Sequence, residues 1–540
     1  MPPRRRSARL SALAAVVAAA AVLAGCTSAT VVEGQGTARG VPGLGPSSSS
    51  PSSGSSGPSS TPATPTQPPA SFQDCSQAFN LKALHFPAGR LAQLQFTCAL
   101  IKVPLDYARP DGAKTDLLLV RVHDTKDTHP TGQLLMNPGG PGASGIELAV
   151  GLSPKMPQSV LDHFDLIGFD PRGVGQSSPI TCTSNKRKDA LNAASPDVLT
   201  RAGFTRAKAL ARSTAQACSR KYGSSLQYYD TVNTARDMDQ VREAAGDSRM
   251  NYLGFSYGTE LGSVYAHLFP HRIRAMVLDG AVDPLTKSIA SARQQLGGFE
   301  GAFDQFAKYC VKTKPCRSIG NPRKAVYAIQ AAARHKPLTV AGSKRTLTFS
   351  LATTGVTEAL YSRSEWKTLG AALVAAKQGR GAGLLALADE YNERYANGRY
   401  SNISDANLTI GCNDSKPGPS DATIRATAKS WAAKYPMFGL DFAPGLFSCQ
   451  QWQPHRTPTP LPTARTTPHT VLVLGNLHDP ATPYQGALDL AKTMGHAEVL
   501  SWNGEGHTSY LEGSSCVNGY VNSYLDTLKL PPQHRTCPAK

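Results

Sequence analysis

The chain has 540 residues, of which 40% are hydrophobic and 17% charged, and its formal net charge is +18. This composition excludes a chain that is disordered throughout and fits a globular protein with disordered ends. The positive charges are spread along the chain, with no Lys/Arg block and no basic residues interleaved with aromatic ones, so we expect no nucleic-acid partner.

The first 26 residues predict an export signal. Basic residues at 4–6 precede an apolar stretch over 10–25, which is shorter than the roughly 18 residues expected of a membrane-spanning helix. The stretch ends in Leu23-Ala24-Gly25-Cys26, which resembles the lipobox of bacterial lipoproteins. The resemblance implies a signal peptide over 1–25, a lipid on Cys26, and an exported protein that the lipid holds at the cell membrane.

A flexible spacer is predicted after this cysteine. Residues 34–71 are almost wholly Gly, Ser, Pro and Thr, and such a segment buries too little apolar surface to offset the entropy lost on ordering. We therefore expect 26–71 to be a lipidated, disordered linker and the folded part to begin near Phe72.

The other ten cysteines predict disulfides. An even number of cysteines in an exported chain is typical of an oxidising compartment, and no Cys/His spacing indicates a zinc site, so we expect neither metal nor cofactor. The sequence does not fix the connectivity, but pairing between neighbours closes a local loop each time. The expected pairs are 75–98, 182–218, 310–316, 412–449 and 516–537.

Short apolar runs alternate with helical stretches through the folded part. Between 229 and 245, apolar residues recur at helical spacing. Strands that alternate with helices predict a mostly parallel sheet with right-handed crossovers, whose ligand site lies at the carboxyl ends of the strands. The predicted strands cover 116–122, 133–136, 165–169, 251–254, 274–278, 471–474 and 497–501.

The motif after the fourth of these strands predicts a nucleophile. Gly254-Phe-Ser256-Tyr-Gly258 has the G-x-S-x-G pattern, in which a serine occupies a strained turn between a strand and a helix. Small residues are needed two positions on either side because larger side chains would clash in that turn. The helix expected over 258–269 points its N-terminus toward the serine and favours the negative charge that develops in the reaction.

An acid and a base are predicted after the last two strands. Asp479 follows the run 471–474 and His507 follows the run 497–501, in the order serine, acid, histidine that G-x-S-x-G enzymes of this type use. A serine hydroxyl needs a base to remove its proton, and the base needs a carboxylate to hold its tautomer. Glu505 and Asp279 remain alternative acids.

A glycine-rich loop is predicted to supply the oxyanion hole. Asn137-Pro-Gly139-Gly140-Pro-Gly142 follows the strand 133–136, and glycines let backbone N–H groups come close to a substrate. Gly139 or Gly140 is expected to pair with the N–H of Tyr257; the sequence does not decide between the two glycines.

Four motifs in order resemble the actinobacterial tripeptidyl aminopeptidase and proline iminopeptidase group of α/β hydrolases, closest to its mycobacterial lipoprotein members, described as carboxylesterase A or as cell-envelope serine proteases. They are the glycine-rich loop at 137–142, Asp-Pro-Arg-Gly-Val-Gly-Gln-Ser at 170–177, Gly-Phe-Ser-Tyr-Gly-Thr at 254–259 and Gly-Asn-Leu-His-Asp-Pro-Ala-Thr-Pro at 475–483. The resemblance covers about 75–537. It implies an α/β-hydrolase fold with a mostly parallel central sheet, an inserted helical cap, and Ser256, Asp479 and His507 as the catalytic triad. Proline iminopeptidases begin the glycine-rich motif with His where Pro138 stands here, which argues against strict proline specificity.

Five segments follow from these observations. They are a signal peptide at 1–25, the lipidated linker at 26–71, a first part of the hydrolase core at 72–283, a helical cap at 284–404, and the C-terminal part of the core at 405–540.

Three functions are compatible with the motifs. The favoured one is a peptidase that acts at a free N-terminus, whose amine would need carboxylates near the site, for which we name Asp414 and Glu260, with Glu358 or Glu365 of the cap as further candidates. The second is a carboxylesterase for short acyl esters or lipids, because both reactions pass through an acyl-enzyme. The third is a catalytically silent binding lipoprotein. The sequence gives no indication of the oligomeric state.

Overall fold

A computed structural model describes residues 66–81, 86, 88–127, 130–286, 288–314, 316–415, 417–453 and 471–539. The predicted signal peptide, Cys26 and the predicted linker up to residue 65 lie outside the described residues. In the described part of the chain, no helix combines the length and the apolar character needed to cross a membrane.

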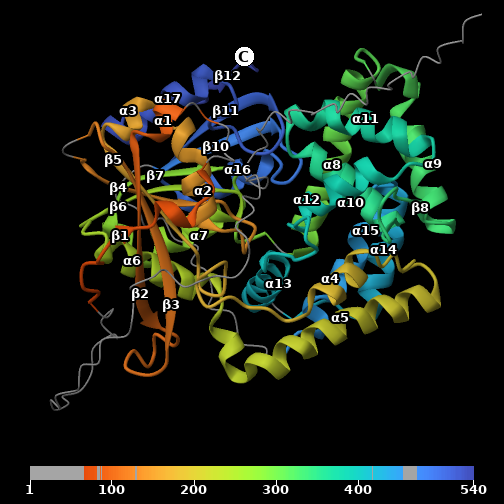
Figure 1. The fold of residues 1–540 in the computed structure, drawn as a ribbon, viewed down its shortest axis with the longest axis horizontal. Coiled ribbons are helices and arrows are strands. Elements are labelled where there is room, and N and C mark those ends of the chain that lie inside the picture. The colour runs from red at the N-terminus through yellow and green to blue at the C-terminus, as the bar shows by residue number, and fades with distance from the viewer. Residues whose placement is uncertain are drawn as a thin grey trace, which may run out of the picture.

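A ten-stranded sheet forms the centre of the larger, left-hand part of the molecule (Figure 1). Its strand order is β1-β2-β3-β5-β4-β6-β7-β10-β11-β12; neighbours pair antiparallel from β1 to β5 and parallel from β5 onward. The strands are β1 Gln73–Asp74, β2 Leu94–Pro104, β3 Lys114–Asp124, β4 Gly132–Asn137, β5 Phe164–Phe169, β6 Met250–Phe255, β7 Ile273–Asp279, β10 Val471–His478, β11 Ala497–Glu505 and β12 Thr536–Cys537. A separate pair joins β8 Leu338–Thr339 to β9 Thr346–Leu347.

The seven predicted strands are confirmed as β3 to β7, β10 and β11. The central strands β5 and β6 are buried along their whole length, as expected of parallel strands covered on both faces. The long antiparallel strand β2 was not predicted, although it carries a partly alternating pattern of buried and exposed residues.

Helices cover both faces of the sheet. α2, α3 and α17 pack on one face, around Leu134 and Leu253, while α6, α7 and α16 pack on the other, around Leu135 and Tyr252. The helices are α1 Ala88–Leu91, α2 Gly145–Leu152, α3 Gln158–Leu161, α4 Asn185–Asn192, α5 Arg201–Tyr222, α6 Thr231–Ala244, α7 Tyr257–Leu268, α8 Ser288–Cys310, α9 Pro322–His335, α10 Phe349–Leu360, α11 Trp366–Lys377, α12 Ala382–Tyr391, α13 Ile403–Asp414, α14 Asp421–Lys434, α15 Gly439–Phe442, α16 Gln485–Met494 and α17 Ser515–Thr527.

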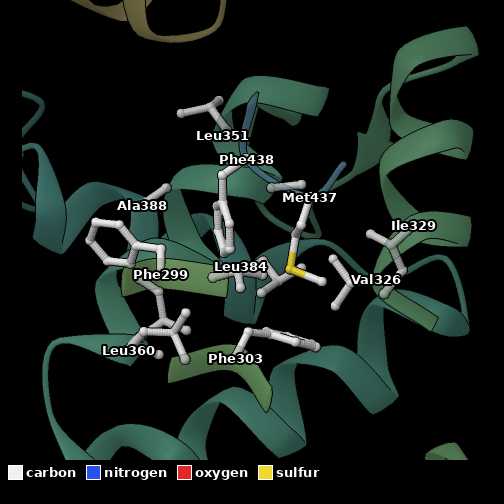
Figure 2. Close-up of a cluster of buried hydrophobic side chains, with 14 of the residues drawn as sticks. Phe299, Phe303, Val326, Ile329, Leu351, Leu360, Leu384, Ala388, Met437 and Phe438 are labelled. Carbon is white, nitrogen blue, oxygen red and sulfur yellow. The ribbon is translucent and has the colours of Figure 1, made fainter. Parts of the chain in front are cut away.

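A separate hydrophobic cluster holds the helical part together, on the right in Figure 1. Figure 2 shows Phe299 and Phe303 of α8 beside Leu360 of α10, with Met437 and Phe438 above them. The helices α8 to α12 lie within the predicted cap, and the cluster that they share also takes in residues of α5 and α14. The bounds of the cap as a domain stay a prediction.

The five predicted disulfides are confirmed. The pairs are Cys75–Cys98, Cys182–Cys218, Cys310–Cys316, Cys412–Cys449 and Cys516–Cys537. Each joins cysteines that are neighbours in the sequence, so the disulfides reinforce local segments and do not tie the ends of the fold together.

Candidate active site

Ser256 stands in the turn between β6 and α7. Its backbone has φ 54° and ψ −126°, a strained conformation for any residue with a Cβ atom, and its side chain is half-buried. A Cβ atom at Gly254 would lie 2.5 Å from the carbonyl oxygen of Gly258, and one at Gly258 would lie 2.8 Å from that of Asn137. The glycines of the motif are therefore required by the close approach of backbone to backbone around the serine.

Asp479 and His507 form a buried pair. Both carboxylate oxygens of Asp479 lie 2.9 Å from Nδ1 of His507, and the two residues are 2% and 1% exposed. Burial lowers the pKa of His507, but the negative charge and hydrogen bond of Asp479 outweigh burial and raise the pKa above its ordinary value. The arrangement matches the role expected of an acid that holds the base in one tautomer.

A dense set of donors orients the carboxylate. The backbone N–H groups of Ala481, Thr482 and Thr508 donate to Asp479 over 2.9, 2.8 and 3.1 Å, and the Thr482 hydroxyl donates over 3.0 Å. Oγ1 of Thr482 is also 3.3 Å from Nδ1 of His507. Asp479 is thus fixed before any substrate arrives.

Residues 279 and 280 bring the nucleophile turn and the base together. The N–H of Ser256 donates to the carbonyl oxygen of Asp279 over 2.9 Å, and a Cβ atom at Gly280 would lie 3.1 Å from Cε1 of His507. The carboxylate of Asp279 accepts from the N–H groups of Ser509 and Tyr510, over 2.9 and 2.7 Å. Asp279 therefore anchors the loop that carries the histidine.

Of the three candidate acids, Asp479 is the one that contacts Nδ1 of His507. Burial raises the pKa of Asp279 to about 6. Oε2 of Glu505 accepts from no group in the described ranges. Nε2 of His507 is also without a hydrogen-bond partner among the described residues, Ser256 included. Contacts of this kind commonly tighten only in the complex with substrate.

The glycine-rich loop lies against the nucleophile. Gly139 has φ 100°, and a Cβ atom there would lie 2.8 Å from the nitrogen of Tyr257 and 2.9 Å from Cβ of Ser256. The N–H of Gly139 already donates to Oδ1 of Asn137 over 3.0 Å, whereas that of Gly140 donates to no residue in the described part of the chain. This difference favours Gly140 and Tyr257 as the donors to an oxyanion.

The predicted amine-binding carboxylates lie on the side of Tyr257. Asp414 accepts from the N–H and the hydroxyl of Thr231 over 3.0 and 2.6 Å, and that hydroxyl is also hydrogen-bonded to the hydroxyl of Tyr257. Burial and the charges of Asp230 and Glu260 raise the pKa of Asp414 well above its ordinary value. Burial and the charge of Asp283 raise the pKa of Glu260 to about 7.

Sequence reasoning missed two residues of the site. Thr482 lies three residues after Asp479, a spacing at which an acid commonly binds the following backbone, so a turn signal was present. Tyr361 comes from the helical part, and its carbonyl oxygen accepts from the N–H of His507 over 2.7 Å. No local pattern around Tyr361 indicates this contact.

Comparisons with known proteins identify the family of the chain. A family model described as "alpha/beta hydrolase fold" matches residues 133–514. The chain is 39% identical to "Serine protease Hip1" of Mycobacterium tuberculosis over 464 residues, which cover 82% of this chain and 87% of the relative. It is 36% identical to "Carboxylesterase B" of the same species over 455 residues, which cover 82% of this chain and 86% of the relative. It is 29% identical to "Tripeptidyl aminopeptidase" of Streptomyces lividans over 480 residues, which cover 86% of each chain. The chain therefore belongs to the α/β-hydrolase family and is a serine hydrolase.

Proposed function

We propose that the protein cleaves peptides at the cell envelope by an acyl-enzyme mechanism in which Ser256, His507 and Asp479 form the catalytic triad. Neutral His507 takes the proton of the Ser256 hydroxyl as its oxygen attacks the carbonyl carbon. The N–H groups of Gly140 and Tyr257 stabilise the oxyanion, and the imidazolium then gives its proton to the leaving amine. Water, activated by the same histidine, hydrolyses the acyl-enzyme. The observation that carries this proposal is the buried Asp479–His507 pair beside the strained Ser256 turn.

Peptides with a free amino terminus are the substrates we favour. Asp414 and Glu260 lie on the side of Tyr257, and the pKa of each carboxyl is raised because its charged form is poorly solvated there. A substrate ammonium group would relieve that unfavourable environment, whereas an acyl ester would not. The relatives named serine protease and tripeptidyl aminopeptidase agree with a peptide substrate.

A comparison of blocked and free substrates tests this choice. We expect a tripeptide p-nitroanilide with a free amine to be cleaved, and its N-acetylated form to be a poor substrate. Glu260→Gln is expected to lower kcat/KM for the free-amine peptide about ten-fold, the effect of a lost interaction of about 1.4 kcal/mol. The same change should leave hydrolysis of p-nitrophenyl acetate unchanged, because that ester has no amine.

Glu498→Gln provides the matched control, since this half-buried glutamate lies on β11 and accepts from the backbone of His534. Equal cleavage of free and acetylated peptides would remove the aminopeptidase assignment. Cleavage of the ester alone would favour the carboxylesterase function, which the 36% identical carboxylesterase B supports. A protein inactive toward the free peptide, the acetylated peptide and the ester would favour the third function, a catalytically silent binding lipoprotein.

We further propose that the enzyme is exported and held at the cell membrane by a lipid on Cys26. The lipobox-like end of the apolar N-terminal stretch supports this location, and so do the five disulfides of the folded part. Expressed in a bacterium that modifies lipoproteins, the full chain is expected to incorporate radiolabelled palmitate and to enter the detergent phase of Triton X-114. Cys26→Ala should abolish both behaviours; continued labelling of this variant would contradict the proposal.

A further inference from the structure

The helical part reaches the catalytic base directly through residues 361–362. The N–H of His507 donates to the carbonyl oxygen of Tyr361 over 2.7 Å, and Ser362 forms an antiparallel bridge with Gly506. Gly506 has φ 104°, and a Cβ atom there would lie only 2.8 Å from the same Tyr361 oxygen. A glycine before the histidine is therefore what lets the two segments come this close.

The side chain of Tyr361 also contacts the base. Its ring lies edge-on to the imidazole of His507, with ring centroids 5.4 Å apart and an interplanar angle of 88°. Tyr361 is 8% exposed, so the contact is shielded from water. Asp479 holds one edge of the imidazole through Nδ1, and the tyrosine ring packs against the same imidazole.

Tyr361 is itself fixed by the helical part. Its ring centroid lies 5.6 Å from that of Phe299 and 6.1 Å from that of Tyr391. Phe299 belongs to the hydrophobic cluster drawn in Figure 2, together with Leu360, the residue before Tyr361. A displacement of α10 or of this cluster would therefore be passed to the imidazole.

We infer that Tyr361 is a positioning residue for His507, so that the helical part supports the base. The inference rests on the proposed function, because it concerns the base of the proposed triad. Nε2 of His507 must face the Ser256 hydroxyl for the proton transfer, and its direction depends on the tilt of the ring. The carboxylate sets the tautomer; Tyr361 sets the tilt.

The test compares Tyr361→Ala with Tyr361→Phe in the full chain. Tyr361→Ala removes the ring and is expected to lower kcat for p-nitrophenyl acetate about ten- to a hundred-fold, the effect of a small misplacement of a catalytic group, with KM nearly unchanged. Tyr361→Phe keeps the ring and should retain most of the activity. The matched control is Tyr327→Ala, which removes a tyrosine that packs against the same cluster from α9.

Two measurements separate positioning from a general loss of structure. Titration with a fluorophosphonate counts the serines that can still react, and kcat is expressed per reactive site. Low-field proton NMR follows the Nδ1 proton shared by His507 and Asp479, and we expect Tyr361→Ala to broaden this signal or remove it, because water then reaches the pair. Tyr327→Ala should keep both the signal and kcat per site.

Wild-type kcat per site together with an unchanged low-field signal in Tyr361→Ala would overturn the inference. So would an equal loss in Tyr361→Phe, since the ring would then not be the cause. The proposed function fails separately, namely if Ser256→Ala hydrolyses the ester like the wild type.

Discussion

Ser256→Ala is expected to lower kcat about 10⁶-fold toward any substrate that the wild type cleaves. The alanine keeps the backbone of the turn but has no hydroxyl, so no acyl-enzyme can form and the residual rate comes from binding and the oxyanion donors alone. Stopped assays with peptide and ester substrates measure the loss, and a fluorophosphonate probe should no longer label the protein. Unchanged hydrolysis of either substrate would show that another group performs the reaction.

Two further variants make this result specific. Ser263→Ala removes a buried hydroxyl from the same helix, one that donates to the carbonyl of Glu260, and should keep its activity. Ser256→Gly should be inactive yet more stable than the wild type by about 1 kcal/mol, because glycine relieves the strain at φ 54°. Denaturant unfolding of Ser256→Gly and of the wild type measures this difference in stability. A glycine variant less stable than the wild type would contradict the inference that the turn is strained.

Asp479→Asn is expected to lower kcat about 10⁴-fold while leaving KM for ester substrates nearly unchanged. The amide can present its NH₂ group to Nδ1 of His507, which stabilises the tautomer that cannot accept the Ser256 proton at Nε2. It also removes the negative charge that stabilises the imidazolium during the reaction.

The same substitution has a defined effect on pH dependence. His507 acts in its neutral form, so activity falls as the pH drops through its pKa, and Asp479 raises that pKa above the ordinary histidine value. The acid limb of kcat/KM should therefore lie above the ordinary value in the wild type and move to lower pH in Asp479→Asn. Asp279→Asn serves as the comparison, since its carboxylate accepts from Ser509 and Tyr510. If Asp279→Asn lost as much kcat as Asp479→Asn or more, the assignment of Asp479 as the acid of the triad would be wrong.

Much of the site could be read from the sequence because each motif directly follows an apolar strand. Ser256 follows β6, Asp479 follows β10, and His507 lies in the loop after β11. The carboxyl ends of parallel strands meet at one edge of a sheet. The topology therefore implies that the three residues approach one another, although they are far apart in the chain.

Contacts between distant segments could not be predicted in this way. The approach of Tyr361 to His507 depends on how the helical part packs on the sheet, and no periodicity in either segment carries that information. The same is true of the hydrophobic cluster that joins α5 and α14 to α8 and α10. The choice between Gly139 and Gly140 required the hydrogen bond from Gly139 to Asn137, which depends on the conformation of the loop.

The order of the disulfides has a consequence for how the chain matures. Reading from the N-terminus, the ten cysteines of the folded part join strictly first with second and third with fourth, through to ninth with tenth. A polypeptide oxidised progressively as it emerges from a narrow channel meets each correct partner as the next thiol to appear. Such a chain reaches its native connectivity without rearranging bonds between wrongly matched thiols.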